Sequence, residues 1–345
     1  MKRRTFQACL GGFILSRGQL PAAKMKRIRI GQIGLAHPHA LGKLNAVRSL
    51  PEIYDFIGVV EPDEKMRRKV KEIRFLSLDE MMSDKNLDAL IIETRVRDLV
   101  TTALPVIEAG KHIHLDKPAG PSIEPFEKLL NTAKRKNLVV QMGYMLRYNS
   151  AFEFMFRSIR EGWFGEIMEI DAMMGKLAGD GMRKELAEFH GGGFFELACH
   201  ILDATIHILG KPKNVQGFNL RTRQNRADHF ADNQLAVLQY DKATATLRCN
   251  HNDPFGFPRR RFHIAGTGGG MEIQPLESGN FTLNLDRDRD GYKKGTQSVQ
   301  LKGGRSYQAE FVDFAKVIRN QKELAWSYDH DLSVHQTLLE ICGMS

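Results

Sequence analysis

The sequence predicts a Rossmann-type α/β domain with a parallel sheet, followed by an α+β domain with a large, mainly antiparallel open sheet. Three observations lead to this prediction. The chain has 345 residues, a length that favours two domains. From Arg27 to about Tyr144, short apolar runs alternate with amphipathic stretches, as in a parallel sheet covered by helices. After about residue 150 the runs become successive and β-rich, which indicates antiparallel pairing.

The first domain is expected to span residues 27–146. Its strands are short apolar runs, and the stretches between them have helical periodicity. Ser122 is the expected N-cap of the last helix. The predicted strands are 28–33, 56–60, 89–92, 112–115 and 138–142, and the predicted helices lie near 40–50, 63–72, 97–109 and 123–136.

The second domain is expected to span residues 147–345, to bind substrate and to form the oligomer interface. Its predicted helices are 151–161, 194–209, 306–320 and 331–342. Its predicted strands are 167–174, 215–221, 234–240, 244–250, 261–265, 271–274, 281–285 and 298–301. Gly266–Gly270 looks like a phosphate loop, but no helix follows it, so we expect a turn.

Residues 1–26 differ from the rest of the chain. Lys2-Arg3-Arg4 precedes a short apolar run and resembles a twin-arginine signal for export to the periplasm. A basic tail is one alternative, and a translation start at Met25, which would leave the protein in the cytoplasm, is another. The run is too short to span a membrane, and no later segment reaches the roughly 18 apolar residues needed, so we expect no stable membrane insertion.

Charge and cysteine content exclude some partners. The formal net charge is +9, but the basic residues before position 30 account for nearly all of it, and the remainder is almost balanced. That balance argues against nucleic acid as a partner. The four cysteines, Cys9, Cys199, Cys249 and Cys342, are far apart and form no C-x-x-C pair, so neither structural zinc nor a disulfide framework is expected. No bound metal is expected elsewhere.

The segment after the first strand resembles a dinucleotide-binding fingerprint that keeps only the first of its three glycines. The pattern G-x-G-x-x-G is represented by Gly34, Ala36 and His39. Gly34 permits the tight turn, whereas the other two glycines normally allow close approach of pyrophosphate and helix. His39 could itself contact a phosphate at a helix N-terminus. Glu61, at the end of the second strand, can bind the adenosine ribose and repel a 2′-phosphate, which favours NAD over NADP.

The strand 112–115 runs into Asp116-Lys117-Pro118. Ligands of open α/β sheets bind outside the carboxyl ends of the strands, so Lys117 is expected to point into the cofactor crevice. A positive nicotinamide nearby would lower the pKa of this lysine and suit it to proton handling. A surface position for the lysine is the alternative.

The helix 194–209 carries a polar stripe on an otherwise apolar background. Glu196, His200, Asp203 and His207 are spaced four, three and four residues apart, which puts them on one helix face. Such a stripe is expected to line a cleft. A solvent-facing stripe and a metal site built from glutamate and histidine are the alternatives.

The order of these motifs resembles the Gfo/Idh/MocA oxidoreductase family over essentially the whole chain after residue 26. In that family the strand before the lysine usually ends Glu-Lys-Pro, with the lysine at the catalytic centre, and this chain has Asp116 in place of the glutamate. The family's glycine run and D-x-G-x-H-x-x-D signature are matched by Gly191–Gly193 and then Glu196, Ala198, His200 and Asp203. The resemblance implies that His200 is the catalytic histidine and Glu196 the substrate-contacting acid.

The resemblance also implies a complete set of site residues and an oligomeric state, a homodimer or homotetramer. The catalytic group would be Lys117, Glu196, His200 and Asp203. The cofactor site would use Gly34, Ala36, His37, His39, Glu61, Thr94, Asp116, Lys117 and Pro118. Substrate would contact Tyr144, Arg147, Glu196 and His200, although Arg147 could instead serve only in an ion pair. His37, His112, His114 and His251 could each reach the cleft, and all four are interpreted as packing residues or as residues that support the site from behind.

The predicted reaction is hydride transfer between NAD and a carbinol carbon of a sugar or cyclitol. His200 would move the hydroxyl proton and Lys117 would polarise the oxygen, with Glu196 and Asp203 orienting His200. Export would favour a redox-neutral alternative with tightly bound NAD, either sugar disproportionation or glycoside cleavage. The depleted fingerprint motivates an alternative of another class, a non-catalytic protein that binds NAD or a sugar.

Overall fold

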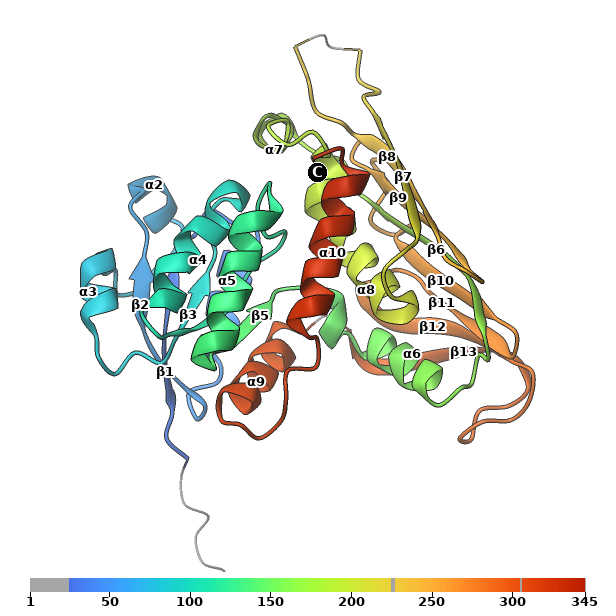
Figure 1. Ribbon diagram of the computed structural model, residues 1–345, viewed down its shortest axis with the longest axis horizontal. Helices are drawn as coiled ribbons and strands as arrows, with labels where there is room; N and C mark the ends of the chain where they lie inside the picture. Colours follow the sequence, from blue (N-terminus) through green and yellow to red (C-terminus); the bar gives the residue numbers. More distant parts are fainter. Residues whose placement is uncertain (1–24, 225–226, 305, 345) are drawn as a thin grey trace, which may run out of the picture.

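The computed structural model describes residues 25–224, 227–304 and 306–344. It contains a five-stranded sheet with the order β2-β1-β3-β4-β5 and an eight-stranded sheet with the order β13-β12-β11-β10-β6-β9-β8-β7. Figure 1 shows the two sheets at opposite sides of the molecule with helices between them. The predicted fold class is confirmed, because the first sheet is parallel and the second is antiparallel at all but one pairing.

The first sheet consists of buried parallel strands. They are β1 (Ile28–Ile33), β2 (Tyr54–Val60), β3 (Ala89–Ile92), β4 (His112–Leu115) and β5 (Val140–Met142). All four residues of β3 are buried, as expected for a central strand covered on both faces. The carboxyl ends of these strands therefore meet at one edge, where β1, β3 and β4 deliver the residues of the site described below.

The helices of this domain mostly follow the periodicity of the sequence. They are α1 (Ala40–Arg48), α2 (Glu64–Arg67), α3 (Leu78–Ser83), η1 (Val96–Asp98), α4 (Leu99–Glu108) and α5 (Ile123–Lys136). The predicted helix 63–72 shortens to α2. The unpredicted α3 begins with a capping box between Ser77 and Glu80, a local signal that was present in the sequence.

The second domain packs helices against one face of the large sheet. Its first elements are η2 (Met145–Tyr148), α6 (Ser150–Arg160), β6 (Ile167–Gly175), α7 (Asp180–Leu186), a π-helical turn η3 (Phe194–Ala198) and α8 (Cys199–Leu209). The remaining strands are β7 (Asn214–Leu220), β8 (Asn233–Gln239), β9 (Thr244–Asn250), β10 (Arg261–Gly266), β11 (Gly269–Ile273), β12 (Ser278–Leu285) and β13 (Gly295–Gly304). Gly266 pairs with Gly269 across a tight hairpin, which confirms the predicted turn.

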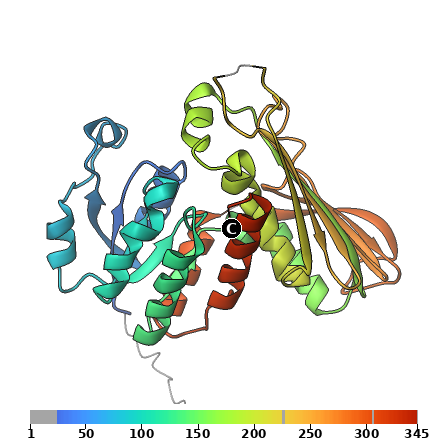
Figure 2. The same ribbon diagram turned by 45° about the horizontal axis from the view of Figure 1, so that its top comes forward.

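The two C-terminal helices, α9 (Tyr307–Ile318) and α10 (Tyr328–Ile341), connect the domains. Phe311 and Phe314 of α9 share a buried cluster with Ile28 and Ile30, so α9 covers the parallel sheet. This differs from the expectation that both helices belong to the second domain. Ala46 and Val47 of α1 belong to the same cluster, so α1 and α9 cover this face of the parallel sheet together. Figures 1 and 2 show α10 between the two sheets.

None of the helices in the described ranges combines the length and apolar character needed to cross a bilayer. The basic segment that resembles an export signal falls on residues 1–24, outside the described residues.

Candidate active site

The turn between β1 and α1 forms one wall of the crevice at the carboxyl edge of the parallel sheet. Gly34 has a φ of +92°, and a Cβ built on it would lie 2.7 Å from the backbone of Glu93. Only glycine fits this turn without strain, as the sequence predicted from the first glycine of the fingerprint.

The amides of this turn are largely used inside the protein. Three of them donate to protein groups: Leu35 to Glu61 Oε2 (2.7 Å), His37 to the carbonyl oxygen of Glu93 (3.1 Å) and His39 to His37 Nδ1 (3.3 Å). Pro38 has no N–H to offer. The loop therefore presents fewer free donors to a pyrophosphate than a complete glycine fingerprint would.

A cavity of about 240 Å³ opens beside the turn, at the ends of β1, β2 and β3. Its lining includes Gly34, Ala36, Glu61, Thr94 and Arg95. Four of these are predicted cofactor residues, so the structure brings them together. The Glu61 carboxylate is buried and is held by the N–H groups of Leu35 and Asp63 (2.9 Å).

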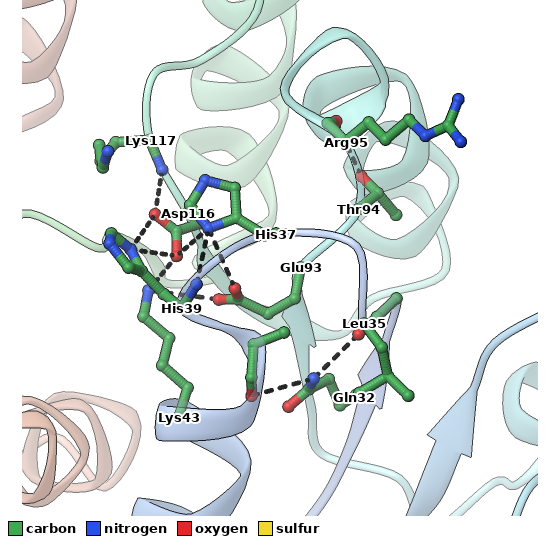
Figure 3. A network of polar contacts seen from close by, with 12 residues as sticks. Gln32, Leu35, His37, His39, Lys43, Glu93, Thr94, Arg95, Asp116 and Lys117 are labelled. Carbon is green, nitrogen blue, oxygen red and sulfur yellow. Dashed lines mark hydrogen bonds and ion pairs between the residues drawn. The ribbon is translucent and has the colours of Figure 1, made fainter. Parts of the chain in front are cut away.

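Deeper in the crevice lies a group of charged and imidazole side chains that we call the crevice cluster: His37, His39, Lys43, Glu93 and Asp116. It is centred on Asp116 Oδ2, which lies 2.8 Å from Lys43 Nζ, 3.1 Å from His39 Nδ1 and 3.2 Å from His37 Nδ1. Lys43 Nζ also lies 3.3 Å from Glu93 Oε1. The side chains of His37, Lys43, Glu93 and Asp116 are fully buried, and they converge from the turn, α1, β3 and β4 (Figure 3).

Burial and mutual charge set the protonation of the cluster. Burial and the neighbouring Asp116 raise the pKa of Glu93 well above its usual value. Burial opposes ionisation of Asp116, but His37, Lys43 and His39 together hold its pKa well below the ordinary range. Burial lowers the pKa of His39 to about 4. At neutral pH the cluster therefore contains an ionised Asp116, a neutral His39 and a Glu93 that readily takes up a proton.

Lys117 is fully buried at the end of β4. Its Nζ donates to the carbonyl oxygen of Glu196 (2.7 Å) and lies 3.2 Å from Glu196 Oε1, while its backbone N–H donates to Asp116 Oδ1 (2.6 Å). The predicted lowering of the Lys117 pKa depends on a nearby nicotinamide and stays a prediction, whereas the protein groups act in the opposite direction. Burial does lower the pKa of Lys117, but the Glu196 carboxylate more than offsets it and the net shift is upward. The protein groups around Lys117 therefore favour its protonated form. Pro118 follows it through a cis peptide bond.

Glu196 lies between two lysines. Lys176 Nζ, from the end of β6, lies 3.2 Å from Glu196 Oε2, opposite the contact with Lys117. Burial would raise the pKa of Glu196, but Lys117 and Lys176 lower it well below its usual value. The carboxylate is thus ionised and fixed at the crevice.

His200, in the first turn of α8, faces the same crevice. Its ring centroid lies 6.0 Å from that of Tyr144 and 6.2 Å from that of His39. Burial lowers its pKa well below the usual value, so the imidazole is neutral. Its Nδ1 has no hydrogen-bond partner among the described residues. The expected orientation of His200 by Glu196 and Asp203 is not observed, because both acids bind other cations.

Arg147 forms a buried ion network with three residues of α8 and α10. Its Nη2 lies 2.6 Å from Asp203 Oδ1 and 2.5 Å from Asp331 Oδ1, and His330 Nε2 lies 2.9 Å from the same Asp203 oxygen. The ion-pair alternative for Arg147 therefore describes this structure, and Asp203 is held behind the site. His207, the last member of the predicted stripe, lines a separate cavity of about 490 Å³.

The remaining histidines make structural contacts, in line with their interpretation as packing residues. His112 Nδ1 accepts a hydrogen bond from the Val139 N–H (3.0 Å). His114 Nε2 lies 2.8 Å from Glu310 Oε1 of α9. His251 is buried beside Cys249, with 3.5 Å between its Nδ1 and the cysteine sulfur. His37 differs from these three because it belongs to the crevice cluster.

Sequence reasoning missed several residues of this site: Lys43, Glu93, Lys176, Glu310, His330 and Asp331. One signal could have found Glu93. It directly follows the apolar strand β3, just as Glu61 follows β2 and Asp116 follows β4. Lys43 gave no such signal, because a lysine in an exposed-looking helix is usually solvated.

The fold and the site define a class of protein. A parallel sheet with a fingerprint turn, followed by an open sheet that carries a histidine helix to the same crevice, is typical of dinucleotide-binding oxidoreductases. Residues 28–144 match the family model described as an oxidoreductase family with an NAD-binding Rossmann fold, and residues 152–272 match the GFO/IDH/MocA C-terminal domain. The chain belongs to the Gfo/Idh/MocA oxidoreductase family, as its motifs predicted.

Similar proteins include characterised and uncharacterised members. The chain is 28% identical to the uncharacterized oxidoreductase YhhX of Escherichia coli K12 over 55% of each protein. It is 26% identical to the NADP⁺-dependent scyllo-inositol 2-dehydrogenase IolW of Bacillus subtilis, over 54% of this chain and 52% of that protein. These matches thus span about half the length of each relative. The solved structure of levoglucosan dehydrogenase with NADH and levoglucosan has the same fold, with a TM-score of 0.78, 17% identity, and 93% and 98% of the two chains covered.

Proposed function

We propose that the protein transfers a hydride between NAD and a carbinol carbon of a sugar or cyclitol. The observation that carries this proposal is that Lys117, from the end of β4, bonds to Glu196 and is close enough to His200 for its charge to act on that ring, and both partners come from the second domain. A protonated lysine, an ionised acid and a neutral imidazole at one crevice are suited to proton movement on a hydroxyl group. The inositol dehydrogenase named above acts on a molecule of the same chemical class.

The described residues fit the adenosine half of NAD. The cavity of about 240 Å³ is lined by Glu61, whose carboxylate can accept hydrogen bonds from the ribose and would repel a 2′-phosphate. At the pyrophosphate end the fit is poorer, because most amides of the turn are bonded within the protein. We therefore place the adenosine half in this cavity and derive no position for the nicotinamide half.

When bound, NAD supplies the group that accepts or donates the hydride. His200, kept neutral by burial, takes the proton of the substrate hydroxyl. The Lys117 ammonium donates two of its three N–H groups to oxygens of Glu196. The third N–H is left to polarise the substrate oxygen. Lys176 acts indirectly by holding Glu196 in place.

A redox-neutral reaction with a retained cofactor is the second candidate, and α7 favours it. Between the β1–α1 turn and α7 the free space is only about 30 Å³, room for one or two water molecules. Arg97 of η1 and Glu188, just past α7, form an ion pair of 2.9 Å across the same boundary. A dinucleotide that extends from the adenosine cavity to beneath this cover would exchange slowly. Export of the protein, which we also propose from its N-terminal motif, would make retention necessary.

A non-catalytic protein that binds NAD or a sugar is the third candidate. The internally bonded amides of the turn favour it, since they weaken the pyrophosphate site.

We further propose that copies of the chain associate through the large sheet, where Phe218 and Leu220 of β7 expose apolar surface. Sedimentation velocity of Phe218→Ser/Leu220→Ser against the unchanged protein tests this association.

Incubation with NAD⁺ and a panel of sugars and cyclitols, followed by absorbance of reduced nicotinamide, tests the main proposal. Lys117→Met and His200→Gln should each lower turnover by about 100-fold or more while NAD affinity stays within a few-fold. Lys176→Met is the matched control, because it contacts the same carboxylate from the far side and should lower turnover less. Wild-type turnover in the first two variants would contradict the proposal.

Mass spectrometry of the denatured protein separates the candidates. One NAD per purified chain supports the retained-cofactor reaction. An empty protein that turns over with added NAD⁺ supports the exchangeable dehydrogenase. An empty protein with no measurable NAD affinity by calorimetry supports the sugar-binding alternative.

A further inference from the structure

We propose that His37, His39 and Asp116 bind a divalent transition-metal ion in the crevice, beside Lys117 and His200. This goes beyond the proposed function, which assigns no role to a metal, and it departs from the expectation that the chain binds none. The site is argued from the geometry of the crevice cluster and from unmatched polar atoms within it.

The three ligand atoms are already gathered. Nδ1 of His37, Nδ1 of His39 and a carboxylate oxygen of Asp116 all lie within 4.8 Å of one another. The two Nδ1 atoms are 3.2 and 3.1 Å from Asp116 Oδ2. Ligands that share one ion through bonds of about 2.0–2.2 Å stand roughly 3.0–3.5 Å apart, so these separations match. The elements that carry them, the β1–α1 turn and the end of β4, are adjacent in the same crevice (Figure 3).

The contacts of His37 cannot all be hydrogen bonds. The His39 N–H donates to His37 Nδ1 at 3.3 Å, which requires a lone pair on that nitrogen. The same Nδ1 lies 3.2 Å from the anionic Asp116 Oδ2, and a hydrogen bond there would require a proton on the nitrogen. A ring nitrogen carries a proton or a lone pair, never both. A metal ion removes the conflict between His37 Nδ1 and Asp116 Oδ2, because both atoms then donate lone pairs to one cation, and the 3.3 Å hydrogen bond from the His39 N–H is given up.

Glu93 supplies an independent observation. It is fully buried and directed into the cluster, 3.6 Å from His37 Nδ1, and Lys43 Nζ lies 3.3 Å from it. Neither of its carboxylate oxygens has a hydrogen bond of normal geometry among the described residues. Glu93 and Asp116 together carry one more charge than Lys43 can balance. A proton or a second cation must supply the balance, since buried unpaired charge is costly.

The second acid–histidine group of the described chain shows the contrast. Asp203, His330 and Asp331 also lie close enough to bind an ion. There, however, the Arg147 guanidinium already forms short contacts with both carboxylates, and His330 bonds to Asp203. Among the described residues, Asp331 Oδ2 is the one buried polar atom of that group without a hydrogen bond, whereas in the crevice cluster Lys43 is shared between two acids and both oxygens of Glu93 lack one, so we assign the metal to the crevice cluster.

Two imidazoles and one carboxylate suit Zn²⁺, Fe²⁺ or Mn²⁺ and leave coordination positions open. Glu93 is the nearest candidate for a fourth ligand. The ring of His39 lies 6.2 Å from that of His200, so an open position can face the substrate side of the crevice. The ion would act there as a Lewis acid on a substrate oxygen, and it undergoes no change of oxidation state in this role.

The test measures metal content of the full-length protein. After chelator treatment, the chain is loaded with Zn²⁺, Co²⁺, Fe²⁺ or Mn²⁺, freed of excess by gel filtration and analysed by mass spectrometry of the elements. One equivalent per chain is expected for the unchanged protein. His39→Gln should lower affinity by at least about 100-fold in an indicator competition, more than outer-shell changes usually do. His37→Gln is the second variant, and His330→Gln is the control that keeps one equivalent.

The outcomes decide the proposal. If none of the four ions binds stoichiometrically, the cluster is a proton-balanced ion network and the site is refuted. Equal metal content in His39→Gln, His37→Gln and the unchanged protein would place any ion elsewhere and also refute it. Circular dichroism of each variant verifies that the fold is retained. No substrate or NAD enters this measurement, so an inactive protein with bound metal counts against the dehydrogenase and not against the site.

Discussion

Arg147 provides a sharp test of the electrostatics that join the domains. It lies on η2, directly after the parallel sheet, and binds Asp203 of α8 and Asp331 of α10, all of them nearly inaccessible to solvent. Replacing the guanidinium with the apolar side chain of methionine leaves the buried Asp331 carboxylate without its cation and Asp203 with His330 as its remaining partner. Arg147→Met is therefore expected to destabilise the protein strongly at pH 7.

The size of the effect follows from the proton that a stranded carboxylate must take up. A carboxyl with an ordinary pKa near 3.9 is neutral at pH 7 only at a cost of about 4 kcal/mol, because each pH unit is worth about 1.4 kcal/mol. This agrees with the roughly 3–5 kcal/mol lost when one partner of a buried ion pair is removed. At pH 5 the same protonation costs only about 1.5 kcal/mol.

The sign of the pH dependence differs between the two proteins. Arg147 keeps the pKa of Asp203 below its usual value, so in the unchanged protein this stabilisation persists at pH 5 and is lost only at lower pH. Without Arg147, burial raises the folded-state pKa, so the penalty is greatest at high pH and shrinks as the pH falls. The deficit of Arg147→Met should decrease by about 3 kcal/mol between pH 7 and pH 5.

Urea unfolding followed by circular dichroism at both pH values measures this deficit. The variant Arg147→Met/Asp203→Asn/Asp331→Asn is the control, because replacing a whole buried ion group with neutral residues often costs little. A triple variant as unstable as the single one would show that the loss comes from packing, since Arg147 also stacks on Tyr144 and Trp326. A deficit that stays constant between pH 7 and pH 5 would likewise refute the electrostatic reasoning.

Three further changes test separate parts of the structure. Gly34→Ala should cost about 2–5 kcal/mol in urea unfolding, because positive φ and a clash act together, whereas Gly110→Ala, also at positive φ but with open space around its Cβ, should cost only about 1–2 kcal/mol; equal costs would show that the close contact with β3 is unimportant. Tyr54→Phe should lose about 1 kcal/mol of unfolding free energy, since its buried hydroxyl donates to a carbonyl oxygen of α9 at 2.6 Å, and an unchanged midpoint would mean that this bond contributes nothing. Glu196→Gln should lower the pKa of Lys117, because it removes the group that most strongly opposes the effect of burial, so the alkaline limb of the turnover profile should move to lower pH, and an unmoved limb would show that Lys117 ionisation does not control the rate.

Sequence periodicity predicted most of the fold because each element buries its own apolar pattern. The strands β1, β3, β4 and β9 coincide with their predicted bounds, and α5 does as well. The elements that periodicity missed are short. α7 covers the crevice through tertiary contacts rather than through a long apolar face, and the packing of α9 on the first domain joins residues more than 250 positions apart. Such distant contacts leave no local pattern in the sequence.

The sequence identified the main residues of the candidate site but not the charged side chains that contact them. Lys117, Glu196 and His200 were found because strand ends and helical spacing place them at one crevice. The cations that bind the acids were not found, because Lys176 and Arg147 come from other elements and a charged side chain has no preferred partner in sequence. The upward pKa shift of Lys117 followed from Glu196, which no spacing rule connects to it.

The depleted fingerprint has a physical counterpart in the crevice cluster. His39 stands at a position where a glycine would leave space, and the buried carboxylates of Glu93 and Asp116 occupy the region behind it. Restoring a glycine at His39 alone would therefore leave the two acids with Lys43 as their main cation and would not recreate an open pyrophosphate site. The protonation state of each side chain in the crevice cluster depends on the charges of the others. We therefore expect that replacing one of these residues alone disturbs the whole cluster.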